Sequence, residues 1–199
     1  MYKLCKTEQS TRRQREIELE LQTMMLESRF DDISISALCE RLNMPRKAFY
    51  RYFDSKDGAL HALIDHTLME FQGFGSQYTE RERRSLRGDL EQFFIFWERR
   101  KDFLDALECS SLTGLLLHAS LSFSVSDMIN PTKFLPEETD WMRSQVFQFA
   151  ICGLMSSMLE WYRGGFVEKT RDMATAACRM LSQPLFPTLA ELGLVDGNK

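Results

Sequence analysis

Residues 33–56, ISISALCERLNMPRKAFYRYFDSK, contain two short helical patterns separated by a turn. Ser34 can cap the first helix, because its hydroxyl accepts from a free backbone N–H of the first turn. Asn43 stands at the turn, where a left-handed backbone suits Gly best and Asn next. Pro45 suits the first turn of the second helix, where its missing N–H would have no partner. The stretch therefore predicts a helix-turn-helix whose second helix runs from residue 45 to about residue 53.

The second helix has an apolar side and a basic side. Phe49 and Phe53 are four residues apart and are expected to face the core. The opposite side carries Arg46, Lys47, Tyr50 and Arg51. Arginine can bind guanine through two hydrogen bonds and lysine can donate to a base edge or a phosphate, whereas tyrosine hydroxyls contact phosphates. The pattern indicates DNA contact, and the alternative is a solvated helix face.

Positive charge is local in this chain. The 199 residues carry a net charge of −4, which argues against a generally basic coat for nucleic acid. Residues 41–56 nevertheless contain five Lys or Arg and one Asp. A small positive region on an acidic protein is typical of a short footprint on DNA.

Helical patterns continue along the rest of the chain. We expect helices at about residues 8–28, 57–81, 86–100, 102–110, 112–128, 136–164 and 169–182, and alternating strand patterns are absent. The expected fold is all-α, with a three-helix head over residues 1–56 and a larger helical body over residues 57–199.

The ordered set of residues in the head resembles the tetracycline-repressor (TetR) family of transcriptional regulators. The matching positions are Phe30, Ser34, Ile35, Leu38, Asn43, Met44, Pro45, Phe49, Tyr50, Phe53, Ser55, Lys56 and Leu60. The resemblance implies that DNA is contacted by Ser34, Ser36, Arg46, Lys47, Tyr50, Arg51, Tyr52 and Lys56. Arg29, Ile35, Pro45 and Ala48 depart from the family pattern, which puts individual contacts in doubt.

The helix expected at residues 136–164 is apolar on nearly all sides, so it should be buried on two sides. Small side chains on it and on the last helix would let another helix approach closely. The resemblance implies a homodimer formed by these two helices. The expected interface consists of Phe149, Ala150, Gly153, Ser157, Ala174, Ala177 and Leu181. The alternative is that these residues pack inside one chain.

The body is rich in aromatic and methionine side chains, most of which should fill the core. A ligand cavity for a small apolar or aromatic effector is the second interpretation. Its expected lining is Trp97, Phe103, Leu116, His118, Phe123, Phe147 and Ile151. His118 lies in the apolar stretch LLLHASL, so we expect either a core imidazole or a polar anchor in the cavity.

Other functional classes find little support. The sequence has no nucleophile–base pair, metal-ligand spacing or Gly-rich phosphate loop, so neither an enzyme, a metal nor a cofactor is expected. Five scattered cysteines, without a signal peptide or a membrane-length apolar run, favour reduced thiols in a cytoplasmic protein. We therefore expect a ligand-responsive repressor that binds a palindromic operator as a homodimer. The competing interpretation is a dimeric ligand-carrier or interaction protein that has lost operator binding.

Overall fold

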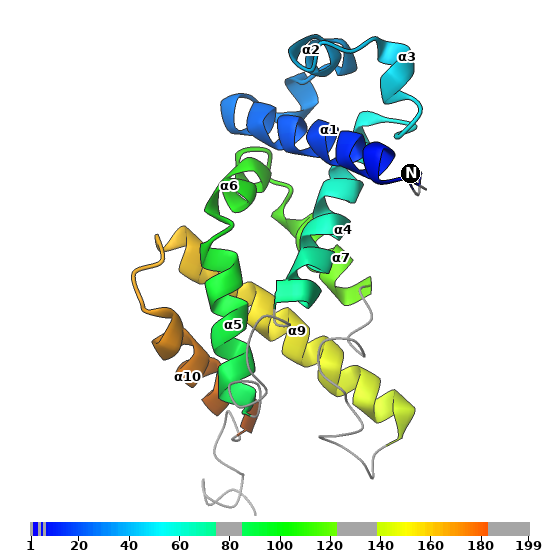
Figure 1. The fold of residues 1–199 in the computed structure, drawn as a ribbon. Coiled ribbons are helices and arrows are strands. Elements are labelled where there is room, and N and C mark those ends of the chain that lie inside the picture. The colour runs from blue at the N-terminus through cyan, green and yellow to red at the C-terminus, as the bar shows by residue number, and fades with distance from the viewer. Residues whose placement is uncertain (1, 4, 6, 75–84, 123–138, 183–199) are drawn as a thin grey trace, which may run out of the picture.

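The computed structural model describes residues 2, 3, 5, 7–74, 85–122 and 139–182, and the fold is all-α as predicted. The head contains α1 (Glu8–Glu27), a 3-10 turn (Phe30–Asp32), α2 (Ile35–Arg41) and α3 (Arg46–Phe49). Figure 1 shows α2 and α3 on the outer side of α1. Thr7 caps α1 by accepting from the Ser10 N–H at 3.2 Å.

The body consists of α4 (Lys56–Phe74), α5 (Leu86–Glu98), α6 (Lys101–Cys109), α7 (Thr113–Ser122), α9 (Asp140–Arg163) and α10 (Thr170–Ser182). These bounds agree with the predicted helices to within a few residues where the structure describes the chain. The predicted continuation of α4 to residue 81 and of α7 to residue 128 lies outside the described residues.

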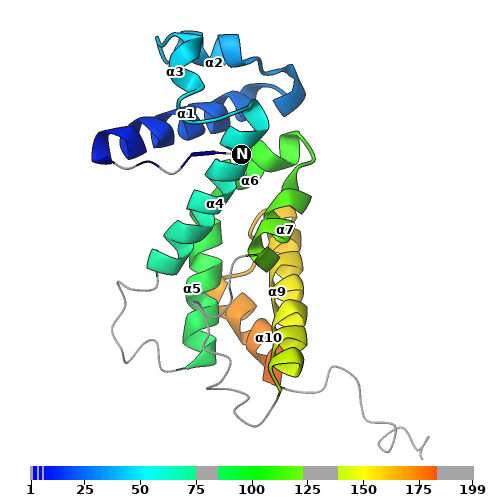
Figure 2. The same ribbon diagram turned by 90° about the vertical axis from the view of Figure 1, so that its right-hand side faces the viewer.

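One continuous apolar core joins head and body. In α1 an apolar stripe is buried, with Ile17, Leu21 and Met25 fully enclosed. This stripe packs on α4 and α6, so that α4 runs from the head into the body and α6 lies directly below α1 (Figures 1 and 2). The orientation of the head is therefore set by α4 and α6 together.

Aromatic side chains fill the body core around α5. Phe94 and Trp97 are buried as predicted, and the ring centroids of Trp97 and Phe103 lie 6.3 Å apart. On its other side α5 packs closely on α10, while α7 packs on α9. None of the described helices is long and apolar enough to cross a membrane.

Candidate DNA-binding surface and its connection to the body

The turn between α2 and α3 has the geometry that the sequence predicts. Asn43 has φ 46°, in the left-handed region. The Asn43 N–H donates to the Glu40 carbonyl at 3.0 Å and the Met44 N–H donates to the Cys39 carbonyl at 2.9 Å, which is a Schellman motif. Met44 is buried beneath the turn, and the Ser34 hydroxyl accepts from the Ala37 N–H at 3.1 Å. Local hydrogen bonds thus fix the angle at which α3 leaves α2.

The prediction that the second helix extends to residue 53 is wrong. The α-helix ends at Phe49, and the chain continues in turns in which the Tyr52 N–H donates to the Phe49 carbonyl at 2.9 Å. These turns bring the Phe53 ring to 5.4 Å from the Phe49 ring, and both rings are fully buried as predicted. Phe53 is therefore buried from a turn and not from a continuing helix.

The outward side of α3 and the turn after it carry cationic groups that no described residue neutralises. Arg46 and Lys47 on α3 and Arg51 in the turn are exposed, and none of them forms an ion pair with any residue that the structure describes. One guanidinium nitrogen of Arg46 donates to the Tyr50 hydroxyl at 3.4 Å. By contrast, Arg41 on α2 pairs with Glu20 and Glu27. Three free positive charges thus lie together on α3 and the turn after it, where anionic phosphates can approach.

The head also matches a known family by sequence. Residues 27–63 match the family described as bacterial regulatory proteins, tetR family. The matched stretch covers α2, α3 and the start of α4, so the likeness to this family is to the helix-turn-helix head.

Solved structures extend the likeness to the body. The "Dihydroxyacetone kinase operon activator DhaS" has 14% sequence identity to this chain and superposes with a TM-score of 0.58. The match covers 92% of this chain and 98% of that chain. At this identity the likeness shows a common fold of head and body. Among curated proteins, none matches the sequence.

The expectation that the Lys56 ammonium is available to phosphate needs correction. Its Nζ donates to the carbonyl oxygens of Phe30, of Asp31 at 3.3 Å and of Ile33 at 2.7 Å. It also lies 4.3 Å from the centroid of the Phe30 ring. The three N–H donors of the ammonium meet three carbonyls, so Lys56 holds the 3-10 turn against the start of α4. Tyr52, another expected contact, is half-buried, whereas Ser36 is exposed.

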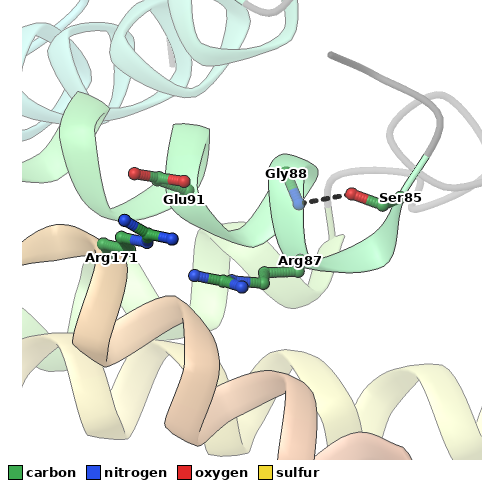
Figure 3. Close-up of a pocket in the computed structure, with 5 residues that line it drawn as sticks. All are labelled: Ser85, Arg87, Gly88, Glu91 and Arg171. Carbon is green, nitrogen blue, oxygen red and sulfur yellow. Dashed lines mark hydrogen bonds between the residues drawn. The ribbon is translucent and has the colours of Figure 1, made fainter. Parts of the chain in front are cut away.

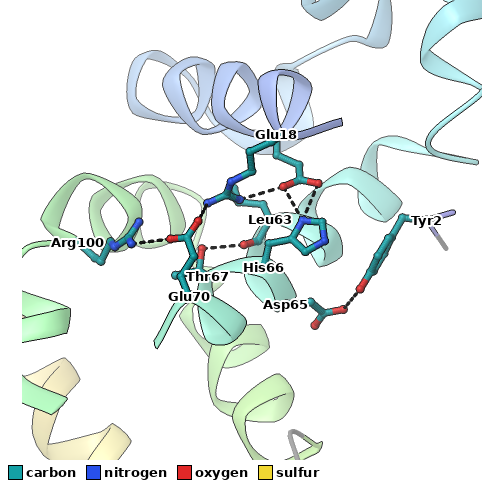
Figure 4. Close-up of polar contacts among 9 residues, drawn as sticks. Tyr2, Glu18, Leu63, Asp65, His66, Thr67, Glu70 and Arg100 are labelled. Atoms are coloured by element: carbon teal, nitrogen blue, oxygen red, sulfur yellow. Dashed lines mark hydrogen bonds and ion pairs between the residues drawn. The ribbon is translucent and has the colours of Figure 1, made fainter. Parts of the chain in front are cut away.

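A network of charged side chains joins the head to the body (Figure 4). No pattern in the sequence predicted these contacts. Glu18 of α1 is fully buried, and its carboxylate lies 2.9 Å from a guanidinium nitrogen of Arg15 and 2.9 Å from Nδ1 of His66 on α4. Glu70, also on α4, pairs with Arg15 at 2.6 Å and with Arg100 at 2.5 Å. Arg100 precedes α6, so the network reaches from α1 through α4 to the α5–α6 junction.

A second set of contacts connects α9 to the head through α6. The Tyr162 hydroxyl donates to Asp105 at 2.8 Å, and Arg163 pairs with Glu108 at 3.1 Å. Burial and the Asp105 carboxylate raise the pKa of Tyr162. At the end of α6 the Ser110 hydroxyl accepts from the Phe30 N–H at 2.7 Å. Side-chain contacts therefore run from α9 through α6 to the base of the head.

The residues predicted to line a ligand cavity differ in their burial. Trp97, Phe103 and Leu116 are buried in the packed core, and Phe147 and Ile151 are half-buried. His118 is exposed, so it is neither a core imidazole nor a polar anchor, because α7 turns that position outward. Phe123 lies outside the described residues. The indole Nε1 of Trp97 is buried and has no hydrogen-bond partner among the described residues.

The open clefts in the described part of the chain lie elsewhere. One cleft has a volume of about 440 Å³ and is lined by Ser85, Arg87, Gly88, Glu91 and Arg171. Figure 3 shows these residues on α5 and α10. The Ser85 hydroxyl accepts from the Gly88 N–H at 3.1 Å and so caps α5. The cleft is open and polar, unlike the apolar cavity that the sequence predicts.

The residues predicted for the dimer interface also differ in accessibility. Phe149 is 70% exposed, Gly153 and Leu181 are exposed, and Ala150 and Ser157 are half-buried. Ala174 and Ala177 are fully buried, because α10 packs on α5 of the same chain. Their assignment to the dimer interface is therefore corrected to intramolecular packing. Only the remaining positions can face a second copy.

Proposed function

We propose that this protein is a ligand-responsive transcriptional repressor that binds a palindromic operator as a homodimer. The observation that carries the proposal is the group of cationic side chains at α3 and the turn after it, on a head that matches the tetR family. Arg46, Lys47 and Arg51 have no ion-pair partner among the described residues. With α3 in the major groove, Arg46 is placed to reach base edges and Lys47 a base edge or phosphate. Tyr50 and Arg51 then hold the DNA backbone.

A dimer supplies the second head that a palindromic operator requires. In the proposed dimer the exposed apolar face of α9 meets its copy, with Trp141, Val146 and Phe149 exposed by 66%, 44% and 70%. Gly153 on the same helix has open space where a Cβ would stand, which permits close approach. Two recognition helices about 34–36 Å apart would contact successive major grooves on one side of DNA.

An effector would act by binding more tightly to the protein in one orientation of its heads. The buried Nε1–H of Trp97 offers a hydrogen bond that no described residue accepts, which favours a small apolar or aromatic effector carrying one acceptor. Occupation of the core near α5 and α6 would displace the contacts that link α6 to the head. Affinity for the operator then falls in proportion to the effector's preference for that state.

The experiment is a binding titration followed by fluorescence anisotropy. The probes are a duplex selected by the protein from a random pool and an unrelated duplex of equal length. The wild type should bind both with steeply salt-dependent affinity and prefer the selected duplex. Arg46→Ala should reduce that preference by about tenfold, whereas Lys101→Ala, an exposed lysine on α6, should not. A wild-type protein without salt-dependent DNA affinity would instead support the carrier or interaction protein.

A further inference from the structure

Residues 2 and 3 lie against the turn that follows the recognition helix α3. Tyr2 forms an isolated antiparallel bridge with Phe53, and the Lys3 N–H donates to the Tyr52 carbonyl at 2.9 Å. The Lys3 side chain turns to the same segment, where its Nζ donates to the Tyr50 carbonyl at 3.0 Å. One residue thus supplies hydrogen bonds to two carbonyls at the end of the DNA-facing element.

These hydrogen bonds matter because α3 is very short. It has 4 residues, whereas isolated helices shorter than ~12 residues are marginal in water. The last carbonyls of a helix have no partner within the helix, and they attract cations. The Lys3 ammonium occupies this position, and Asp54 at 3.8 Å helps to keep it there. The conformation of the segment after Phe49 therefore depends on residues outside the helix-turn-helix itself.

Tyr2 connects the segment after Phe49 to α4. Its hydroxyl donates to Asp65 at 3.0 Å, and its ring meets the His66 ring edge-on with centroids 5.6 Å apart (Figure 4). His66 in turn contacts the buried Glu18 of α1. The end of α3 is thereby connected, through residues 2 and 3, to the helices that set the orientation of the head.

We infer that Lys3 is a positioning residue for DNA recognition. Its ammonium fixes the carbonyl of Tyr50, and the hydroxyl of Tyr50 accepts from Arg46 at 3.4 Å. The inference rests on the proposed DNA-binding function, but the role assigned to Lys3 is distinct from a phosphate contact. Lys3 acts through Tyr50 and Arg46, so its loss reduces discrimination between DNA sequences more than it reduces affinity for DNA in general.

The test compares Lys3→Met, which keeps the aliphatic stem, with Lys3→Arg, which keeps a donor. Lys101→Met is the matched control, because Lys101 has 57% of its side chain exposed against 54% for Lys3 and also pairs with one carboxylate. Two quantities are measured on the full chain. The first is hydrogen exchange of the amides at residues 50–53, relative to α1. The second is affinity for the selected and unrelated duplexes over a range of salt concentrations.

Lys3→Met should accelerate exchange at residues 50–53 by about fivefold and lower affinity for the selected duplex by a similar factor, since one charge-assisted hydrogen bond is lost. Affinity for unrelated DNA should stay unchanged, Lys3→Arg should restore both quantities, and Lys101→Met should alter neither.

Equal losses on both duplexes, with a salt slope lower by about 0.9, would identify Lys3 as a phosphate contact and overturn the inference. Unchanged exchange at residues 50–53 would also overturn it. The exchange measurement does not depend on DNA. If the wild type binds no DNA, the proposed function fails, whereas exchange still decides whether Lys3 holds the end of α3.

Discussion

The carboxylate of Glu18 lies 2.9 Å from Nδ1 of His66, and this buried contact joins the first helix of the head to the helix that enters the body. Arg15 completes the arrangement at 2.9 Å from the same carboxylate. A fully buried carboxylate is stable only when it is paired and hydrogen-bonded. Glu18 therefore ties the stability of the fold to the orientation of the head.

Glu18→Gln should lower the free energy of unfolding by about 3 kcal/mol, because it removes the charge that Arg15 and His66 face. Urea denaturation followed by circular dichroism measures the change. The control is Glu16→Gln in the same helix, whose partners Arg12 and Arg13 lie on the surface, and it should have little effect. Equal losses in both variants would show that the buried network adds nothing.

Substitution of Lys56 should lower stability, whereas substitution of Lys47 should weaken DNA binding, although both residues lie in the helix-turn-helix region. Lys56→Met should reduce stability by about 2 kcal/mol, because three backbone carbonyls lose a charged donor. Lys47→Met should leave the melting temperature unchanged and weaken DNA binding, with a salt slope smaller by about 0.9. Calorimetry and anisotropy titrations on both variants separate the two roles. A destabilised Lys47→Met would contradict the assignment of that residue to the DNA surface.

The left-handed backbone of Asn43 offers a test of the turn. Asn43→Ala should cost about 1 kcal/mol, because a Cβ without a local hydrogen-bonding group disfavours φ 46°. Asn43→Gly should be neutral or slightly stabilising at the same position. Thermal unfolding of the two variants gives the comparison, and the interpretation fails if alanine is tolerated as well as glycine.

Phe149 tests the proposed dimer. Phe149→Asp should shift the protein from dimer to monomer in sedimentation velocity, because a carboxylate replaces a ring that is 70% exposed in the single chain. Loss of the dimer should also weaken binding to a palindromic duplex. Met69→Asp is the matched control, since Met69 is an exposed apolar residue on α4 and should leave the dimer intact. A dimeric Phe149→Asp protein would place the interface elsewhere.

Tyr2 makes the stability of the head depend on alkaline pH. Burial and the neighbouring Asp65 raise the pKa of Tyr2 from 10.0 to about 12. A raised pKa means that the folded state favours the neutral phenol, so its contribution is complete below pH 10 and is lost as the pH rises to about 12. Wild type should therefore be more stable than Tyr2→Phe at pH 8, and the difference should shrink above pH 10. A difference that is constant from pH 8 to 11.5 in urea unfolding would contradict this coupling.

The local features of the head could be predicted because they depend on neighbours in the sequence. Ser34 as a cap, Asn43 at positive φ and Phe49 in the core each follow from a pattern a few residues long. The same reasoning was wrong for the end of α3, because the segment after Phe49 is bound by Lys3, which is 47 residues from Tyr50 in sequence.

Charged and small side chains did not predict the packing correctly, because their burial depends on which residues pack against them. Glu18 on a helix rich in Glu and Arg indicates a solvated face, and only the approach of His66 makes burial possible. Ala174 and Ala177 favour close helix contact without specifying which helix, and the structure places α5 of the same chain there. His118 sits in an apolar stretch yet is exposed, since it does not lie on the face of α7 that buries Thr113, Leu116 and Ser120.

The sequence by itself determined the helix-turn-helix, its caps and the basic side of its second helix, because these follow from backbone geometry and the spacing of residues. Tertiary structure alone decided which charges remain free for DNA. Arg46, Lys47 and Arg51 stay unpaired among the described residues, whereas Lys56, Arg41 and Arg15 are held by groups that only the fold brings near. The physical reason is that a cationic side chain can bind another molecule only if it is not already paired with acceptors of the protein itself.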